Sequence, residues 1–345
     1  MQGRFRQVIT GPKQRIVDMA VQPTEEPRNV VERGSAIRVR RIVGDPFVLL
    51  YVGIYGVVLG LAHSLEGFGL ALPIIVLLTM GLAFTAVAAW TTRGMSRPEF
   101  PVMNPLAEST VIVSYLFVIG GSFLTWGRGA TQAVTSEPAH SIVVLATKVL
   151  VFVVGPYLLF RGLWGYRLRS VAELRPRWRA HWKVIFWMAL VVLPFQALLG
   201  QGLSDIREAQ VLPWQLVVGS ILTLGWLVIE VGLVEEYSFR VLLQTRLAAL
   251  IRSEVGGVVL MALLFGLTHA PGLYFSGGHG IEALGSSPSP FLAIAYSIVV
   301  ISPAGLFLGT LWARTRNLWL VIIVHALFDW LPHITPLTKA FTGGS

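Results

Sequence analysis

The chain has 345 residues, of which 54% are hydrophobic and only 13% are charged. Its mean hydropathy of +0.69 is far too high for an ordinary soluble domain, in which about 25% of residues carry charge. The sequence contains no cysteine, which excludes disulfides, cysteine-ligated zinc and a thiol nucleophile. Because helices satisfy their own backbone groups in lipid, the composition predicts an all-α polytopic membrane protein.

Apolar runs near the bilayer-spanning length of about 20 residues recur along the chain and predict about eight to nine transmembrane helices. The candidate spans are Phe47–His63, Phe68–Trp90, Ser109–Trp126, Ser141–Phe160, Trp182–Leu199, Trp214–Val234, Gly256–His269, Phe291–Trp312 and Leu318–Leu331. Residues 1–45 show no sustained apolar period, and we predict that they form a basic, flexible cytoplasmic tail.

The net charge of +9 is not spread evenly. Basic residues gather in the tail, in the connector 161–183, and at Arg246, Arg252, Arg314 and Arg316. The alternate connectors, at residues 64–67, 127–140, 200–213 and 270–290, are nearly neutral. This alternation follows the positive-inside rule and predicts a multi-pass protein of the cell membrane with a cytoplasmic N-terminus.

Anionic lipid headgroups explain the basic charge better than nucleic acid does, so we expect the lipid bilayer, and no nucleic acid, as a partner.

Six ionisable side chains interrupt three of the apolar runs, where each charge costs about 2.5–3.5 kcal/mol at mid-membrane. They are Glu235, Glu236, Arg240, His269, His325 and Asp329. Such groups usually face a polar cavity and carry function, so these six are the candidate catalytic residues. The earlier runs are almost free of charge, and they contain a Gly-xxx-Gly spacing at Gly56 and Gly60 that is typical of packed membrane helices.

Helix geometry predicts that the first two motif-bearing runs place their groups at one depth. At about 1.5 Å per residue, Glu236 and His269 both lie roughly 24 Å from the basic turn at residues 252–253. His325 and Asp329 lie roughly 12–18 Å beyond a second basic turn, and helix tilt can close the difference.

Spacing within each run is also informative. Glu236 and Arg240 are four residues apart and can pair on one helix face, whereas Glu235 is turned about 100° away and is left free for general-base chemistry. Phe265 lies one turn before His269, where it can shield the imidazole from lipid.

Each of these features also has a non-catalytic explanation. A Glu–Arg pair can be purely structural, and histidines near helix ends are more often interfacial than catalytic. The co-occurrence of six groups at compatible depths favours an active site.

In chain order the three motifs read Glu235-Glu236-Tyr-Ser-Phe-Arg240, Phe265-Gly-Leu-Thr-His269 and His325-Ala-Leu-Phe-Asp329. This ordered set resembles the EExxxR, FxxxH and HxxxN or HxxxD motifs of the CPBP family, the CAAX proteases and bacteriocin-processing enzymes also called the Abi family. The resemblance covers roughly Trp214–Trp330. It implies an intramembrane endopeptidase that cleaves a membrane-associated protein or peptide.

Composition and the placement of the motifs divide the chain into three parts, the last of which the resemblance covers. Residues 1–45 are the tail, residues 46–181 are the N-terminal transmembrane helices with the basic connector, and residues 182–345 are a transmembrane catalytic core. The resemblance implies nothing about the function of the first two parts.

The resemblance also implies roles for the motif residues. Glu235 and His269 would activate the attacking water, His325 and Asp329 would stabilise the oxyanion, and the Glu–Arg pair of the first motif would hold the site together. Asp329 departs from the asparagine that prenyl proteases favour, and an ionised aspartate is a poor oxyanion donor, so it would be protonated, orient His325 or ligate a metal.

The family is often called a metalloprotease family. His269, His325 and Asp329 are candidate ligands for a zinc ion with a water in the open position. Because HExxH is absent from the sequence, we leave this metal open and expect no other cofactor.

Two other classes of function stay open. The first is a non-catalytic membrane immunity or interaction protein on the same fold, against which the complete motif set argues. The second is a proton-coupled transporter with a Glu–His relay. A transporter would more often show paired repeats and broken helices in both halves, whereas the ionisable motifs here are confined to the second half.

Overall fold

The computed structural model describes residues 44–123, 134, 136–175, 177–209, 211–275, 277 and 281–342. Within these ranges the secondary structure is helical, with one isolated β-bridge between Glu173 and Asn317 and no strand. The prediction of an all-α polytopic membrane protein is therefore confirmed. The predicted flexible tail lies outside the described residues, apart from Gly44 and Asp45.

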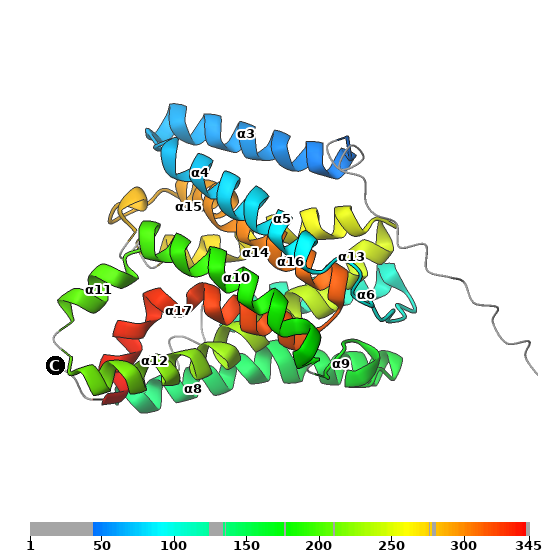
Figure 1. Cartoon of the computed structure of the whole chain (residues 1–345). Coiled ribbons are helices and arrows are strands. Elements are labelled where there is room, and N and C mark those ends of the chain that lie inside the picture. Colours follow the sequence, from blue (N-terminus) through cyan, green and yellow to red (C-terminus); the bar gives the residue numbers. More distant parts are fainter. Residues whose placement is uncertain are drawn as a thin grey trace, which may run out of the picture. The chain divides into compact units, whose positions relative to one another are not determined.

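Helices follow one another along the chain (Figure 1). In chain order they are α3 (Pro46–Glu66), α4 (Ala71–Val76), η1 (Leu77–Phe84), α5 (Thr85–Thr91), α6 (Pro105–Tyr115), η2 (Leu116–Gly120), α8 (Glu137–Val149), η4 (Leu150–Val154), α9 (Gly155–Trp164), η5 (Leu168–Ser170), α10 (Trp178–Leu199), α11 (Gly202–Glu208), α12 (Pro213–Leu227), η6 (Val228–Leu233), η7 (Glu236–Gln244), α13 (Thr245–Leu250), α14 (Glu254–Phe275), η8 (Glu282–Leu284), α15 (Pro290–Tyr296), η9 (Ser297–Ile301), α16 (Ser302–Thr315) and α17 (Leu318–Thr342). The short η5 and η8 are 3₁₀ turns, and the other η elements are π-helical segments that continue neighbouring α-helices.

Eight of the continuous helical runs in the described ranges are long and apolar enough to cross a membrane. They are Pro46–Glu66, Ala71–Thr91, Ala139–Trp164, Trp178–Leu199, Pro213–Leu250, Glu254–Phe275, Pro290–Thr315 and Leu318–Phe341. The remaining candidate span, Ser109–Trp126, corresponds to a shorter apolar helix, Pro105–Gly120, and its last residues lie outside the described ranges. The structure thus gives the lower of the two predicted numbers of spans.

Two predicted helix ends are wrong. The helix α14 runs to Phe275 through Pro271, and α17 runs to Thr342 through Pro332 and Pro336. A proline removes only one backbone hydrogen bond from the helix. Ending the helix in or near lipid would leave several polar backbone groups without partners, so continuation costs less.

The motif-bearing helices lie at the centre of the bundle. The helix α14 packs against α16, while α17 packs against α10, α11 and α12. Figure 1 shows α3 and α4–α5 on one side of this central group and α8 on the opposite side. The long connector between α9 and α10 returns to the core, where Glu173 bonds through its backbone to Arg316 and Leu318.

The first half of the chain holds paired charges that its apolar runs conceal. Glu108 in α6 is fully buried and its Oε2 lies 3.1 Å from Nε of Arg246. Lys148 in α8 places Nζ 2.7 Å from Oε1 of Glu230. In both pairs the partner belongs to the long helix Pro213–Leu250, so these charges join the two halves. Inspection of single runs cannot detect such pairs.

Candidate active site

The first motif lies within a helix of 38 residues, Pro213–Leu250, in which the segment η7 is π-helical. Single π-helical turns inside α-helices are frequent at functional sites. Two side chains from the following α-helix satisfy backbone oxygens of this segment. Thr245 donates to the carbonyl of Arg240 at 3.1 Å, and Arg246 donates to the carbonyl of Val241 at 2.9 Å. The distorted segment is therefore held by hydrogen bonds from its own C-terminal end.

Glu236 and Arg240 form the ion pair that their spacing predicts. Oε2 of Glu236 lies 3.3 Å from Nε of Arg240, and both side chains are fully buried. The Arg240 guanidinium also lies over the ring of Phe265, 4.6 Å from its centroid. This cation–π contact joins the first motif to the second.

His325 occupies the centre of the site and is bracketed by three carboxylates. Its Nδ1 lies 2.7 Å from Oε1 of Glu236, and its Nε2 lies 3.5 Å from Oδ2 of Asp329 and 4.0 Å from Oε2 of Glu235. Glu236 therefore holds Arg240 with one oxygen and His325 with the other. Because an ionised carboxylate only accepts hydrogen bonds, Nδ1 of His325 carries a proton.

His269 presents one free ring nitrogen beside this group. Its Nδ1 lies 2.7 Å from the carbonyl oxygen of Phe265, which can only accept, so Nδ1 carries a proton and, in the neutral imidazole, Nε2 has the lone pair. The Phe265 ring packs between the two histidines, 4.9 Å from His269 and 5.9 Å from His325 between ring centroids. Asp329 is close enough to His269 to interact with it electrostatically. The six predicted residues thus gather into one cluster.

The third motif lies deeper along its helix than its distance from the preceding turn suggests. Arg316 and Asn317 in that turn are almost fully buried, because the backbone of Glu173 lies across them and bonds to the carbonyl of Arg316 at 3.0 Å. Asn317 caps the start of α17 through its side chain. Because the turn at Arg316 and Asn317 lies inside the protein, α17 begins below the surface. His325 therefore reaches the same depth as Glu236.

Close approach of the helices depends on two glycines that the sequence did not single out. A Cβ on Gly232 would lie 2.8 Å from Cγ2 and 2.9 Å from the carbonyl oxygen of Ile322 in α17. A Cβ on Gly266 would lie 2.8 Å from Cβ of Ser302. No local pattern distinguishes these glycines from others in the chain, so only the packing identifies them.

His269, His325 and Asp329 are the three predicted zinc ligands. Across the described residues, no group of three or more His, Cys, Asp and Glu side chains is arranged to hold a metal ion. Nδ1 of His325 is engaged by Glu236 and Nδ1 of His269 by a backbone carbonyl, so either histidine would bind a metal through Nε2. We therefore derive no step through a metal, and the zinc prediction stays a prediction.

Comparison with known proteins identifies the part of the chain that carries the cluster. Residues 214–331 match a family model described as type II CAAX prenyl endopeptidase Rce1-like. No curated protein and no solved structure matches the chain. The matched segment begins in α12 and ends in α17, so it contains all six clustered residues. Residues 214–331 are therefore similar to the Rce1-like type II CAAX prenyl endopeptidase family, as the three motifs indicate.

Proposed function

We propose that this protein is an intramembrane endopeptidase that hydrolyses a peptide bond in a membrane-associated protein or peptide, with Glu235 as the base that activates water. The observation that carries the proposal is the state of Glu235 itself. Its side chain is one-quarter exposed, while its Oε2 atom is buried without a hydrogen-bond partner. Glu236, beside it, is fully buried, pairs with Arg240 at 3.3 Å and bonds to His325 at 2.7 Å. A purely structural cluster has no need for a second, partly exposed carboxylate.

In this mechanism Glu235 takes a proton from a water molecule, and the resulting hydroxide attacks the carbonyl carbon of the scissile bond. Nε2 of His269 retains a lone pair and shares in holding the water. The proton then passes to the departing amine as the C–N bond breaks. Glu235 is thereby returned to its ionised form, and two peptide products leave.

The oxyanion of the tetrahedral intermediate requires hydrogen-bond donors in fixed positions. In the charged form of His325, Nδ1 donates to Glu236 and Nε2 carries a second proton on the side where Asp329 and Glu235 lie. We assign the oxyanion to this Nε2 proton. In this proposal Asp329, at 3.5 Å, orients the imidazole, so no ionised carboxylate has to act as a donor.

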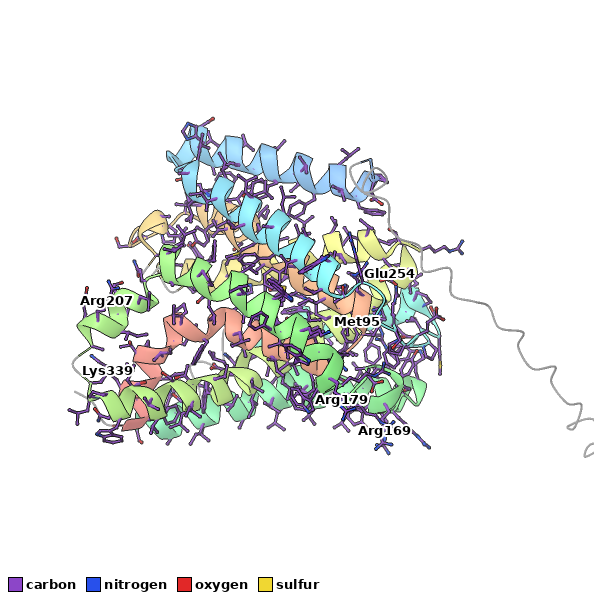
Figure 2. The ribbon with its side chains drawn as sticks, viewed as in Figure 1. Met95, Arg169, Arg179, Arg207, Glu254 and Lys339 are labelled. Atoms are coloured by element: carbon purple, nitrogen blue, oxygen red, sulfur yellow. The ribbon has the colours of Figure 1, made fainter. Side chains whose placement is uncertain are left out.

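We further propose that the end of the bundle that bears the basic connector faces the cytoplasm of a cell. Arg169 and Arg179 lie at the same end as Glu254, whereas Arg207 and Lys339 lie at the other end (Figure 2). An excess of arginine at one end is the signature of the cytoplasmic side.

The proposal is tested by incubating purified protein with a panel of membrane-tethered peptides and detecting the products by mass spectrometry. We expect the wild type to cleave at least one peptide, and His269→Ala to lose about 10²–10⁴-fold in rate. The matched control is His63→Ala. His63 at the end of α3 also places Nδ1 against a backbone carbonyl, 3.0 Å from that of Phe68, but lies outside the cluster, so its rate should equal that of the wild type.

A chelator arm addresses the zinc prediction in the same assay. Cleavage that persists in chelator and is lost in Glu235→Ala supports water activation by glutamate. Loss in chelator with recovery on added zinc would instead make His269, His325 and Asp329 ligands. Cleavage that survives both Glu235→Ala and His269→Ala would overturn the proposed site.

A further inference from the structure

A second polar site lies away from the catalytic cluster, at the end of the bundle where α5, α13 and α16 end. It is a surface cavity of about 310 Å³, which we call the arginine cavity. Its charged lining residues are Arg97, Arg252, Arg316, Glu99 and Glu254. None of the six clustered residues lines it. Neither the motifs nor the family match accounts for it.

The charges of the arginine cavity are only partly paired. Arg316 bonds to both oxygens of Glu254, at 2.8 and 3.0 Å, and Arg97 pairs with the same carboxylate. Among the described residues, no hydrogen bond or ion pair is found for the side chains of Arg252 or Glu99. Three arginines and two glutamates leave one positive charge in excess. The exposed Arg252 side chain is therefore free to meet an anion.

Buried Arg316 remains a cation at this site. Burial lowers its pKa to about 10, against the opposing attraction of Glu254, so the guanidinium is still protonated at neutral pH. Among the described residues, Arg252 and Arg316 are the two non-glycine residues with positive φ, at 55° and 48°. This backbone conformation is unfavourable for any residue with a side chain and would be favourable for glycine. Both arginines therefore line the cavity in a strained backbone conformation.

The cavity touches the ends of all three helical runs that carry the motifs. Thr245 follows η7, Glu254 begins α14 and Arg316 lies two residues before α17. Ser253 accepts a hydrogen bond from the backbone N–H of Gly256, so the N-terminus of the 22-residue α14 opens at this cavity. Its helix dipole adds positive potential there. An anion bound here would contact the starting or ending turn of each catalytic helix.

The position of the cavity indicates which chemical class of anion it would bind. Its lining comes from connectors at the ends of membrane-spanning runs, which is the depth of lipid headgroups. Glu254 and Met95 lie toward one end of the molecule in Figure 2, and Arg207 and Lys339 lie toward the other. Phe100 and Val102 add apolar lining next to the arginines. Guanidinium groups bind phosphate by paired, charge-assisted hydrogen bonds.

We propose that the arginine cavity binds a phosphate group, carried by a phospholipid headgroup or present as free phosphate, and that Arg252 is its primary ligand. Arg97 and Arg316 share their remaining N–H groups with the phosphate, and the bound anion links the ends of the three catalytic helices. The proposal does not depend on proteolysis, because binding can be measured without it.

The test measures binding to the full-length protein in a neutral detergent by native mass spectrometry. Short-chain phosphatidylglycerol, short-chain phosphatidylcholine and sodium phosphate are titrated separately at constant ionic strength. We expect Arg252→Gln to bind about tenfold more weakly than the wild type, the factor produced by about 1.4 kcal/mol. Glu99→Gln should bind more tightly, because it removes a competing negative charge. Arg207→Gln is the matched control, because Arg207 is an exposed arginine at the other end of the molecule.

Binding of free phosphate as well as lipid would show that the cavity takes the phosphate group by itself. Binding of lipid alone would show that Phe100 and Val102 contribute to holding the headgroup, and both results support the site. Equal weakening in Arg252→Gln and Arg207→Gln, or no binding of any of the three ligands, would overturn it. A thermal unfolding scan verifies that each variant is folded.

Discussion

Two helical runs of nearly equal hydropathy occupy opposite environments in this protein. Ala139–Trp164 has a mean hydropathy of 2.3, and 6% of its most apolar window is buried inside the protein. Pro290–Thr315 has a mean hydropathy of 2.2, and 67% of its window is buried. In lipid, an apolar side chain gains little by turning inward. Hydropathy therefore predicts which segments cross the membrane and does not predict which of them form the core.

Small and polar side chains distinguish the inner helices from the outer ones. Ser297, Ser302 and Gln244 are fully buried in the inner helices, whereas α3 exposes large apolar residues such as Val57 and Leu65. Hydrogen bonds and close packing, rather than the burial of apolar area, drive the association of membrane helices. Polar substitutions should therefore cost more inside than outside, and the following predictions test this contrast.

The largest expected difference is between two carboxylates on the same helix. Glu235→Gln removes the proposed base while keeping its shape, and we expect the cleavage rate to fall about 10²–10⁴-fold. Glu230→Gln, five residues earlier, alters a carboxylate that pairs with Lys148 on the outer helix α8, so its rate should stay close to that of the wild type. Rates on a peptide cleaved by the wild type measure both. Equal losses would show that Glu235 has no special role.

The next contrast is between a buried and an exposed ion pair. Arg240→Met leaves Glu236 charged and fully buried without its partner, and this should lower the free energy of unfolding by about 3–5 kcal/mol. Arg177→Met breaks a pair with Glu173 in which the Arg177 side chain is 46% exposed, and this should cost less than about 1 kcal/mol. Unfolding in detergent, monitored by circular dichroism, compares the two. Similar losses would mean that Arg240 is not in a buried pair.

The smallest contrast is between glycines. Gly232→Ala places a methyl group against the backbone of α17 and should destabilise the protein by about 1–3 kcal/mol through overpacking. Gly56→Ala should be neutral or slightly stabilising, because nothing lies within 4 Å of a Cβ at Gly56 and alanine favours a helix. The same unfolding assay applies, and a Gly56→Ala loss as large as that of Gly232→Ala would contradict the packing.

The surroundings of Gly56 and Gly60 also correct the expectation that their spacing marks a packed helix face. Gly56 and Gly60 have the spacing of a helix-packing motif, yet both are exposed and neither has a neighbour within 4 Å of a Cβ. Gly232 and Gly266 allow close packing without such spacing between them, whereas Gly305 and Gly309 have the spacing and a close neighbour at both positions. A short motif does not specify a partner, because packing depends on what lies opposite the helix.

The sequence by itself determined the class of the protein, the positions of its spans and the residues of the candidate site. Charges inside apolar runs are costly, so Glu235, His269 and His325 stand out without any structure, and the family match covers them. Tertiary structure alone decided the depth of α17, which depends on a buried turn beneath Glu173. It also decided the pairing of Glu108 with Arg246 and the gathering of arginines around one cavity. These features join residues far apart in the chain, and helical periodicity carries no information about contacts between helices.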